Sequence, residues 1–172
     1  MERTGLQRTW VRITLTILTF AVMALIFWFS TETADDSDET SGQISREVIN
    51  VLYPEYATYT VEWQQRLYNE VQYAVRKAAH FSEYALLGIV LRLCLESWFG
   101  KQRWLNPATW LGGVFYACTD ELHQLMTEGR NGQWTDVLID SSGVLAGLLI
   151  SASVLLWIGR RRTKAEADQR CP

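Results

Sequence analysis

The sequence is poor in cysteine and lacks the short motifs that mark many enzyme families. Of its three cysteines, Cys94 and Cys118 lie within long apolar segments and Cys171 lies next to the last residue, so we expect no structural disulfide. The sequence has no HExxH metalloprotease motif, no GxSxG nucleophile motif and no glycine-rich phosphate loop. Motifs of these classes therefore assign no enzymatic activity to the chain.

Basic residues are nearly absent between Thr31 and Val75. This stretch carries nine acids and only two basic residues, Arg46 and Arg66. Many of the remaining basic residues collect in three short segments. They are Arg3, Arg8 and Arg12; Lys101 and Arg103; and Arg160, Arg161, Arg162 and Lys164. The net charge of -3 therefore divides into an acidic segment and basic ends, which argues against a nucleic-acid partner.

Apolar residues are concentrated in four blocks, at about 13–30, 79–99, 104–121 and 137–158. Each block has roughly the ~20-residue length at which an α-helix crosses a bilayer. Tryptophan, which prefers the membrane–water interface, stands at the edges of these blocks. The residues concerned are Trp10, Trp28, Trp98, Trp104, Trp134 and Trp157. The pattern predicts an all-α integral membrane four-helix bundle.

The basic segments also predict the orientation in the membrane, because short loops rich in Lys and Arg stay on the cytoplasmic side. We expect residues 1–12 and the basic tail 159–172 to be cytoplasmic, and the domain at 13–158 to be a multi-pass unit of the cytoplasmic membrane. The acidic stretch after the first block then faces outward. No small-x-small cleavage site follows Ser30, so the first block is interpreted as an uncleaved anchor.

The first outer loop is expected to contain one or two amphipathic helices. The polar string TETADDSDETSG has no apolar periodicity and predicts an exposed loop. Beyond it, apolar residues recur at helical spacing from Ile44 to Leu52, until Pro54 stops the pattern, and again from Val61 to Ala74. The second stretch runs into the block at 79–99, either as one long helix or as a kinked pair. The string TEGRNGQW predicts a tight outward turn before the last block.

The two histidines of the chain, His80 and His123, each stand near carboxylates at the outward ends of their blocks. Helical spacing places three polar stripes at this face. They are His80, Glu83 and Tyr84; Asp120, His123 and Gln124, with Glu121 beside them; and Asp136 and Asp140, which continue through Gly143 and Gly147. Arg76, Lys77 and Arg130 are nearby countercharges. Because ionisable groups in membrane spans are costly, we expect one shallow, outward-open functional pocket.

Three chemical interpretations of these stripes stay open. His80, Glu83, Asp120 and His123 are candidate ligands of a divalent metal, since zinc needs about three such ligands and an open water position. His80, Glu83, Asp120, Glu121 and His123 are alternatively candidate catalytic residues of an acid/base pair. The same charges could instead form ion pairs that fix helix register. For Arg92 and Glu96, four residues apart, a simple ion pair is the better interpretation.

The glycines of the last block predict a close helix contact. The string GVLAG is a small-xxx-small surface, which lets two helix backbones approach each other. Since Asp136 and Asp140 lie on the same stripe, the contact should bring these acids into the bundle.

Two strings, RKAAHFSEYALLG and CTDELHQLMTEGRNGQWTDVLIDSSGVLAG, resemble the VanZ-like family of small bacterial membrane proteins. The resemblance spans all four blocks, and its specific part covers Arg76 to Gly88 and Asp120 to Gly147. The chain departs from the family pattern at Glu128, where proline is expected, and at Thr31 and Glu32, where Ser or Gln is expected. The resemblance implies an association with resistance to teicoplanin, a lipid-tailed glycopeptide that acts on cell-wall precursors outside the membrane.

Two functions follow as hypotheses. In the first, an outer pocket engages a membrane lipid, a lipid-linked cell-wall precursor or a lipoglycopeptide. Its candidate ligand-binding residues are Arg76, Lys77, Tyr84, Gln124, Arg130, Asp136 and Asp140. In the second, the protein is a membrane-embedded hydrolase or transferase that acts on an envelope lipid through a metal or an acid/base pair. A transporter is less well supported, because the charges cluster at one face and no polar line crosses the bilayer.

Overall fold

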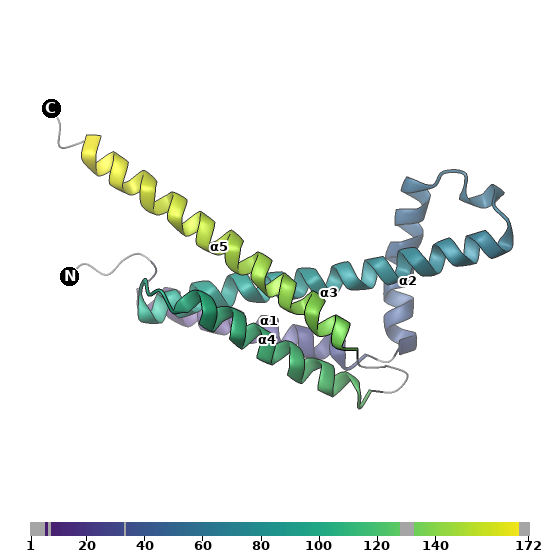
Figure 1. Cartoon of the computed structure of the whole chain (residues 1–172), viewed down its shortest axis with the longest axis horizontal. Helices are drawn as coiled ribbons and strands as arrows, with labels where there is room; N and C mark the ends of the chain where they lie inside the picture. The colour runs from purple at the N-terminus through teal and green to yellow at the C-terminus, as the bar shows by residue number, and fades with distance from the viewer. Residues whose placement is uncertain (1–5, 7, 33, 128–132, 169–172) are drawn as a thin grey trace.

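A computed structural model of the chain describes residue 6 and residues 8–32, 34–127 and 133–168. Over these ranges the chain is helical and has no strand, which confirms the all-α class. The helices are α1 (Thr9–Ser30), α2 (Ala34–Leu52), α3 (Val61–Phe99), α4 (Leu105–Gln124) and α5 (Trp134–Asp168), with the 3-10 helix η2 (Tyr56–Thr58) between α2 and α3 (Figure 1).

Helix α3 lies at the centre of the fold. It contacts α1, α2, α4 and α5, and α5 also packs against α4. The helices α1, α3, α4 and α5 run in alternating directions (Figure 1). The start of α1, the end of α5 and the α3–α4 turn therefore lie at one end of the molecule. The end of α1, the end of α4 and the start of α5 lie at the other.

Among the described residues, three helices are long and apolar enough to cross a membrane: Thr9–Ser30, Val61–Phe99 and the Trp134–Arg161 part of α5. They contain three of the four predicted blocks. Helix α4 has 20 residues but is less apolar, and it does not meet the same criterion of length and composition. Helix α5 continues past the predicted end of its block, to Asp168.

The stretch from Val61 into the second block forms one continuous helix, and not the kinked pair that was the alternative. Helix α3 has 39 residues. At ~1.5 Å per residue it is about 58 Å long, roughly twice the ~30 Å of a bilayer's hydrocarbon core. Its first half extends beyond α1, α4 and α5, with α2 packed across it (Figure 1).

The prediction of an exposed loop for TETADDSDETSG was wrong, because α2 begins at Ala34 and takes in most of this string. Acidic residues favour the first turns of helices, and the helix is fixed further along by a buried face. Ser41, Ser45 and Ile49 are buried there, and Gln72 of α3 donates a hydrogen bond to Ser41 Oγ over 3.3 Å. Helix α2 ends at Leu52, two residues before Pro54, as predicted.

Glycine allows α3 and α5 to approach closely, as the small-xxx-small string predicted. A Cβ atom at Gly147 would overlap the carbonyl oxygen of Ala85, and one at Gly143 would overlap that of Phe81. Gly88 of α3 lies equally close to the backbone of Val144. This contact sets the distance between the polar residues that precede the glycines on the two helices.

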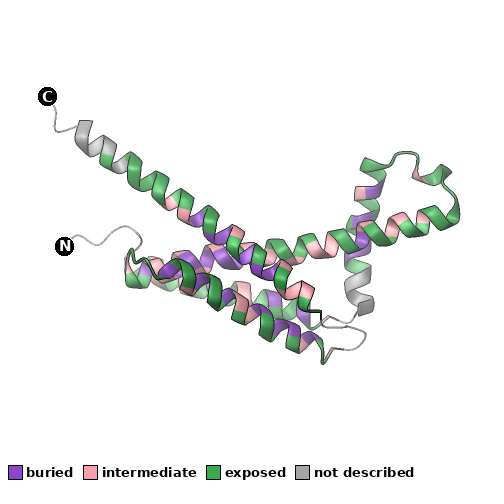
Figure 2. Cartoon of the chain, viewed as in Figure 1, coloured by how far each residue is buried: buried purple, intermediate pink, exposed green. Residues whose placement is uncertain are grey.

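Buried residues follow the contacts between helices, and large apolar side chains cover much of the remaining surface (Figure 2). Tyr84, Leu87, Ala117 and Val144 form the centre of the core, with Ile26 of α1 against them. The exposed apolar side chains are numerous along the outward faces of α1, α4 and α5. A surface of this kind is typical of helices that face lipid or a partner.

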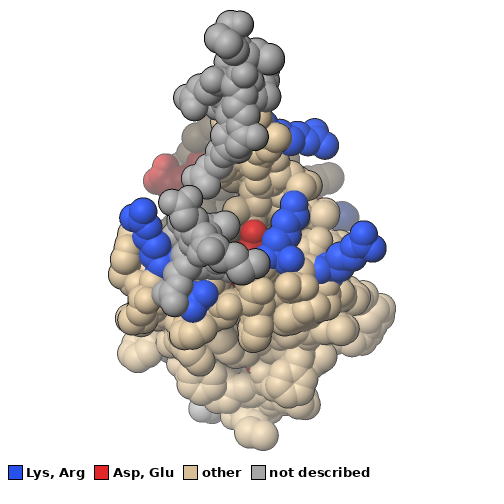
Figure 3. All heavy atoms as spheres, turned by 90° about the vertical axis from the view of Figure 1, so that its left-hand side faces the viewer, with Lys and Arg blue, Asp and Glu red and all other residues tan. Residues whose placement is uncertain are grey.

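Basic side chains gather at the end of the molecule where α1 starts and α5 ends (Figure 3). Arg8, Lys101, Arg103, Arg160 and Arg161 are exposed at this end, and Arg12 is partly buried. We call this surface the basic end and define it by these six residues. It unites the three basic segments of the sequence.

Candidate functional site

Helices α3 and α5 make two polar contacts at the end opposite the basic end. Lys77 Nζ donates to Asp136 Oδ1, and His80 Nδ1 lies 3.8 Å from Asp140 Oδ1. The two α3 residues are three positions apart and the two α5 residues are four apart, so each pair shares a helix face. The second distance exceeds that of a direct hydrogen bond, so the contact is electrostatic.

Helix α4 contributes a second set of polar residues, and the side chains of this set are buried. Asp120, Glu121 and Gln124 are each less than a tenth exposed. Gln124 Nε2 donates to Asp120 Oδ2 over 3.3 Å, and Glu121 Oε1 accepts from the backbone N–H of Gln133, just before α5. The Gln124–Asp120 bond lies within α4, and the Glu121–Gln133 bond holds the end of α4 against the start of α5.

Tyr84 lies between the acids of α4 and α5 and is completely buried. Its phenol interacts electrostatically with Asp120 and Asp140, and Asp140 in turn interacts with Asp120, Asp136 and Glu121. The ring of Tyr116 is 6.3 Å away. We call Lys77, His80, Tyr84, Asp120, Glu121, Asp136 and Asp140 the carboxylate cluster.

Several polar atoms of the carboxylate cluster have no hydrogen-bond partner among the described residues. They are both carboxyl oxygens of Asp140 and one carboxyl oxygen of Glu121. Asp140 is 1% and Asp120 is 3% exposed. Burying such groups without a partner costs roughly 1–3 kcal/mol each. Stability alone therefore does not explain an arrangement of four carboxylates around one lysine.

His80 and His123 lie in different surroundings, although the sequence suggested a matched pair. His80 faces Asp140 of α5, whereas the ring of His123 stacks on Phe27 of α1 with ring centroids 4.6 Å apart. Among residues 8–32, 34–127 and 133–168, no three His, Cys, Asp or Glu side chains lie together so that they could hold a metal ion. The predicted metal set of His80, Glu83, Asp120 and His123 is thus not assembled there.

A pocket of about 150 Å³ opens on the other side of α3, toward α1 and α2. Its polar lining residues are Ser30, Glu32, Thr40, Ser41, Arg76, His80 and Glu83. Its apolar lining residues are Ile26, Phe29, Ile44, Val75 and Ala79. We call this the α1–α2–α3 pocket. The sequence predicted one open pocket between the second, third and fourth blocks, but the acids of α4 and α5 are enclosed.

His80 belongs to both features, since it lines the α1–α2–α3 pocket and faces Asp140 of the carboxylate cluster. Arg76 and Glu83 also line the pocket, and Glu83 interacts electrostatically with Asp140 as well. Sequence reasoning missed Thr40 and Ser41, because they fall in the string that was interpreted as a loop. The helical spacing that links Ser41 to Ser45 and Ile49 is the signal that could have identified them.

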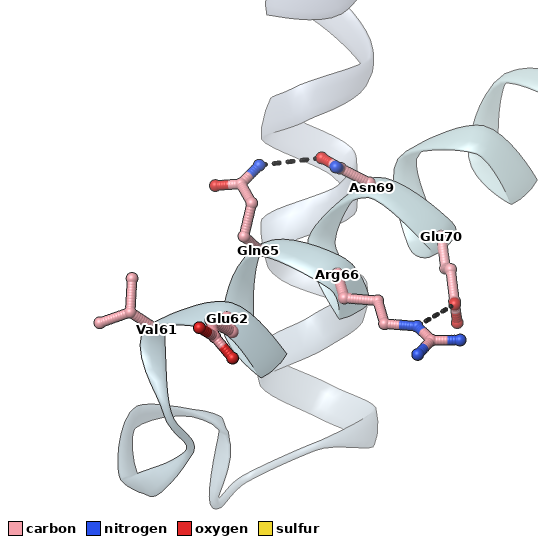
Figure 4. A pocket seen from close by; sticks show the side chains of 6 residues that line it. All are labelled: Val61, Glu62, Gln65, Arg66, Asn69 and Glu70. Atoms are coloured by element: carbon pink, nitrogen blue, oxygen red, sulfur yellow. Dashed lines mark hydrogen bonds and ion pairs between the residues drawn. The ribbon is translucent and has the colours of Figure 1, made fainter.

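A second depression lies at the start of α3 (Figure 4). It is lined by Val61, Glu62, Gln65, Arg66, Asn69 and Glu70. Its polar side chains pair with one another: Gln65 donates to Asn69 over 2.9 Å, and Arg66 pairs with Glu70 at 3.1 Å. A shallow, self-paired face of a single helix is a poor candidate for a site.

Two further predictions concern charged residues. The ion pair of Arg92 and Glu96 is confirmed, with Nη1 and Oε2 2.7 Å apart, and Arg92 Nε also donates to Asn106 Oδ1 over 2.8 Å. Arg130, a predicted ligand-binding residue, and most of the predicted turn TEGRNGQW lie outside the described residues.

A comparison with protein families gives one match. The family model described as VanZ/LLP1 matches residues 15–157, which is most of the chain. No curated protein and no solved structure matches significantly. The matched range takes in both the carboxylate cluster and the α1–α2–α3 pocket.

Proposed function

Since the chain belongs to the VanZ/LLP1 family and is a helical membrane protein, we propose that it engages the polar head group of a lipid-linked or amphiphilic ligand at the outer face of the bacterial cytoplasmic membrane. The observation that carries this proposal is the α1–α2–α3 pocket. Its lining combines polar and charged side chains with apolar ones, as the head and the first carbons of an amphiphile require.

In this proposal α4 is the fourth membrane span. Its 20 residues reach about 30 Å, enough to cross the hydrocarbon core. Trp110, Leu111, Phe115 and Leu122 are exposed on it, whereas its two acids are buried. The helix therefore directs apolar side chains toward lipid and polar ones toward α3 and α5.

The basic end faces the cytoplasm in this arrangement, because loops rich in Lys and Arg stay inside. Both termini are then cytoplasmic. The pocket and the carboxylate cluster lie at the opposite end, on the outer side, where cell-wall precursors and a lipoglycopeptide such as teicoplanin meet the membrane. The association of the family with teicoplanin resistance fits this position.

The size of the pocket limits what it can hold. A volume of about 150 Å³ is smaller than the ~300 Å³ at which sites for drug-sized ligands begin. A head-group fragment fits, and the rest of an amphiphile would extend along α1 and α2 toward lipid. Arg76, His80 and Glu83 supply hydrogen bonds and charges of both signs.

The test is retention of teicoplanin, and in a parallel arm of a polyprenyl phosphate, by the protein in nanodiscs. Ala79→Phe fills the pocket, since Ala79 lines it. Ala78→Phe is the matched control, because Ala78 is exposed but is not part of the pocket wall. We expect Ala79→Phe to weaken retention of at least one probe at least tenfold and Ala78→Phe to leave it unchanged. Equal retention of both probes by the two variants would contradict the proposal.

A second candidate function is supported by the contact of His80 with Asp140 at 3.8 Å. An imidazole backed by a buried carboxylate and facing a pocket is an arrangement used in general acid/base catalysis. In this alternative the protein is a hydrolase or transferase of an envelope lipid or precursor. Mass spectrometry of the lipid after incubation would detect product with the wild type and none with His80→Gln. Retention of substrate without any product supports binding alone.

A further inference from the structure

Helix α5 leaves the other helices as it runs toward the basic end (Figure 1). Ser151 is buried, and beyond it none of the described side chains of α5 is buried (Figure 2). Val154, Leu156 and Trp157 are each about half exposed, at 49%, 51% and 54%. This part of α5 is an apolar helix without a protein partner among the described residues.

This apolar part of α5 is followed by cations of the basic end. Arg160 and Arg161 follow directly, and the Arg161 guanidinium lies 3.8 Å from the centroid of the Trp157 ring. Lys101 and Arg103 stand at the α3–α4 turn and Arg8 stands before α1. Of these five exposed cations, none pairs with a carboxylate of the described residues.

Aromatic side chains lie beside the cations. Trp98 and Phe99 at the end of α3 and Trp104 before α4 are exposed, and Arg12 lies 5.3 Å from the centroid of the Trp98 ring. Tryptophan prefers the depth at which lipid head groups meet acyl chains. The apolar part of α5, the aromatic side chains and the cations therefore follow one another along the molecule. The acyl chain, the glycerol and the phosphate of a phospholipid have the same order.

We propose that the basic end and the free part of α5 bind an anionic phospholipid of the adjacent leaflet. The acyl chains would lie along Val154, Leu156 and Trp157, and the phosphate would pair with Arg160 and Arg161. Basic clusters at the ends of membrane helices attract anionic lipid. The proposal is independent of what the outer pocket binds.

A second copy of the chain is a less suitable occupant. Two copies that joined along the free part of α5 in the same orientation would bring Arg160 and Arg161 of both copies together. Like charges at close range oppose such a contact. An anionic lipid has the opposite charge and an apolar tail, so it suits both parts of the surface.

The test uses native mass spectrometry of the detergent-purified protein with two probes, dioleoyl phosphatidylglycerol and dioleoyl phosphatidylcholine. The variant Arg160→Gln/Arg161→Gln removes two cations from the basic end. The matched control Arg46→Gln/Arg66→Gln removes two exposed cations from α2 and the outer half of α3. Each cation near an anionic lipid is worth roughly a fivefold change in affinity.

We expect the wild type to retain phosphatidylglycerol over phosphatidylcholine. In Arg160→Gln/Arg161→Gln the preference for phosphatidylglycerol over phosphatidylcholine should fall roughly 25-fold by the same rule. The control variant should keep this preference. Equal losses in both variants, or no preference in the wild type, would overturn the proposal. Light scattering in the presence of phosphatidylglycerol should report a monomer. A dimer broken by Val154→Arg would show instead that a second copy occupies the surface.

Discussion

His80 of α3 and Asp140 of α5 face each other beside the glycine contact of the two helices, with Nδ1 and Oδ1 3.8 Å apart. The contact joins two regions that the sequence could not connect. On one side of His80 lies the α1–α2–α3 pocket, and on the other lie the enclosed acids of α4 and α5. Glycine makes it possible, because Gly143 and Gly147 let the two backbones meet next to these residues.

The glycine contact predicts a steep difference between two alanine substitutions on α5. Gly147→Ala should lower the free energy of unfolding by about 1–3 kcal/mol, the usual range for overpacking, because its Cβ would overlap Ala85 O. Gly159→Ala is the matched control, since nothing lies within 4 Å of a Cβ at Gly159. It should be neutral or stabilising by up to about 1 kcal/mol, from helix propensity. Thermal unfolding in detergent compares the two, and similar losses in both would contradict the close contact.

Lys77 is predicted to be a stabilising residue of the carboxylate cluster. Lys77→Gln leaves Asp136 without its cation, in a region that also contains Glu121 and Asp120. We expect a loss of roughly 1–3 kcal/mol in the free energy of unfolding, the cost of an unpaired buried polar group.

The control for this prediction is Arg66→Gln, which breaks the exposed Arg66–Glu70 pair. Exposed pairs of this spacing contribute only about 0.3–0.5 kcal/mol. If Lys77→Gln and Arg66→Gln unfold at the same temperature, the cluster does not depend on its lysine.

The proposed orientation predicts a difference in chemical labelling between two exposed positions. In a cysteine-free background, Gln65→Cys should react with a membrane-impermeant maleimide in intact cells. Lys101→Cys should react only after the membrane is opened. Both residues are exposed, so access and not burial decides the outcome. Labelling of Lys101→Cys in intact cells would reverse the orientation.

Metal removal is predicted to leave ligand retention unchanged. Among the described residues, no three metal-binding side chains lie together. Teicoplanin retention in nanodiscs should therefore be the same before and after dialysis against a chelator, with metal content followed by mass spectrometry. A loss of retention that zinc restores would show that a metal takes part.

The sequence predicted the helices with the strongest apolar pattern and failed where small polar residues form the buried face. Helix α2 packs through Ser41 and Ser45, which an apolar pattern does not register, so the first part of the helix was interpreted as a loop. By contrast, Pro54 marked the end of α2, and the GVLAG string marked the contact of α5 with α3.

The candidate site was predictable within each helix but not between helices. Spacing alone placed Asp136 and Asp140 on one stripe, and both face α3. Asp120 and His123 also appeared to share a face, yet three residues leave side chains about 60° apart around a helix. Helix α4 is rotated so that Asp120 is buried beside Tyr84 while His123 stacks on Phe27. No local pattern fixes that rotation.

The most direct test of the account is Asp140→Asn, measured for unfolding and for ligand retention on the same nanodisc sample. Asp140 is buried among like charges, and its carboxyl oxygens have no hydrogen-bond partner among the described residues. We expect the unfolding temperature to stay the same or rise while retention of teicoplanin or the polyprenyl phosphate falls. A lower unfolding temperature with retention unchanged would contradict it, and would identify the acids as structural ion pairs.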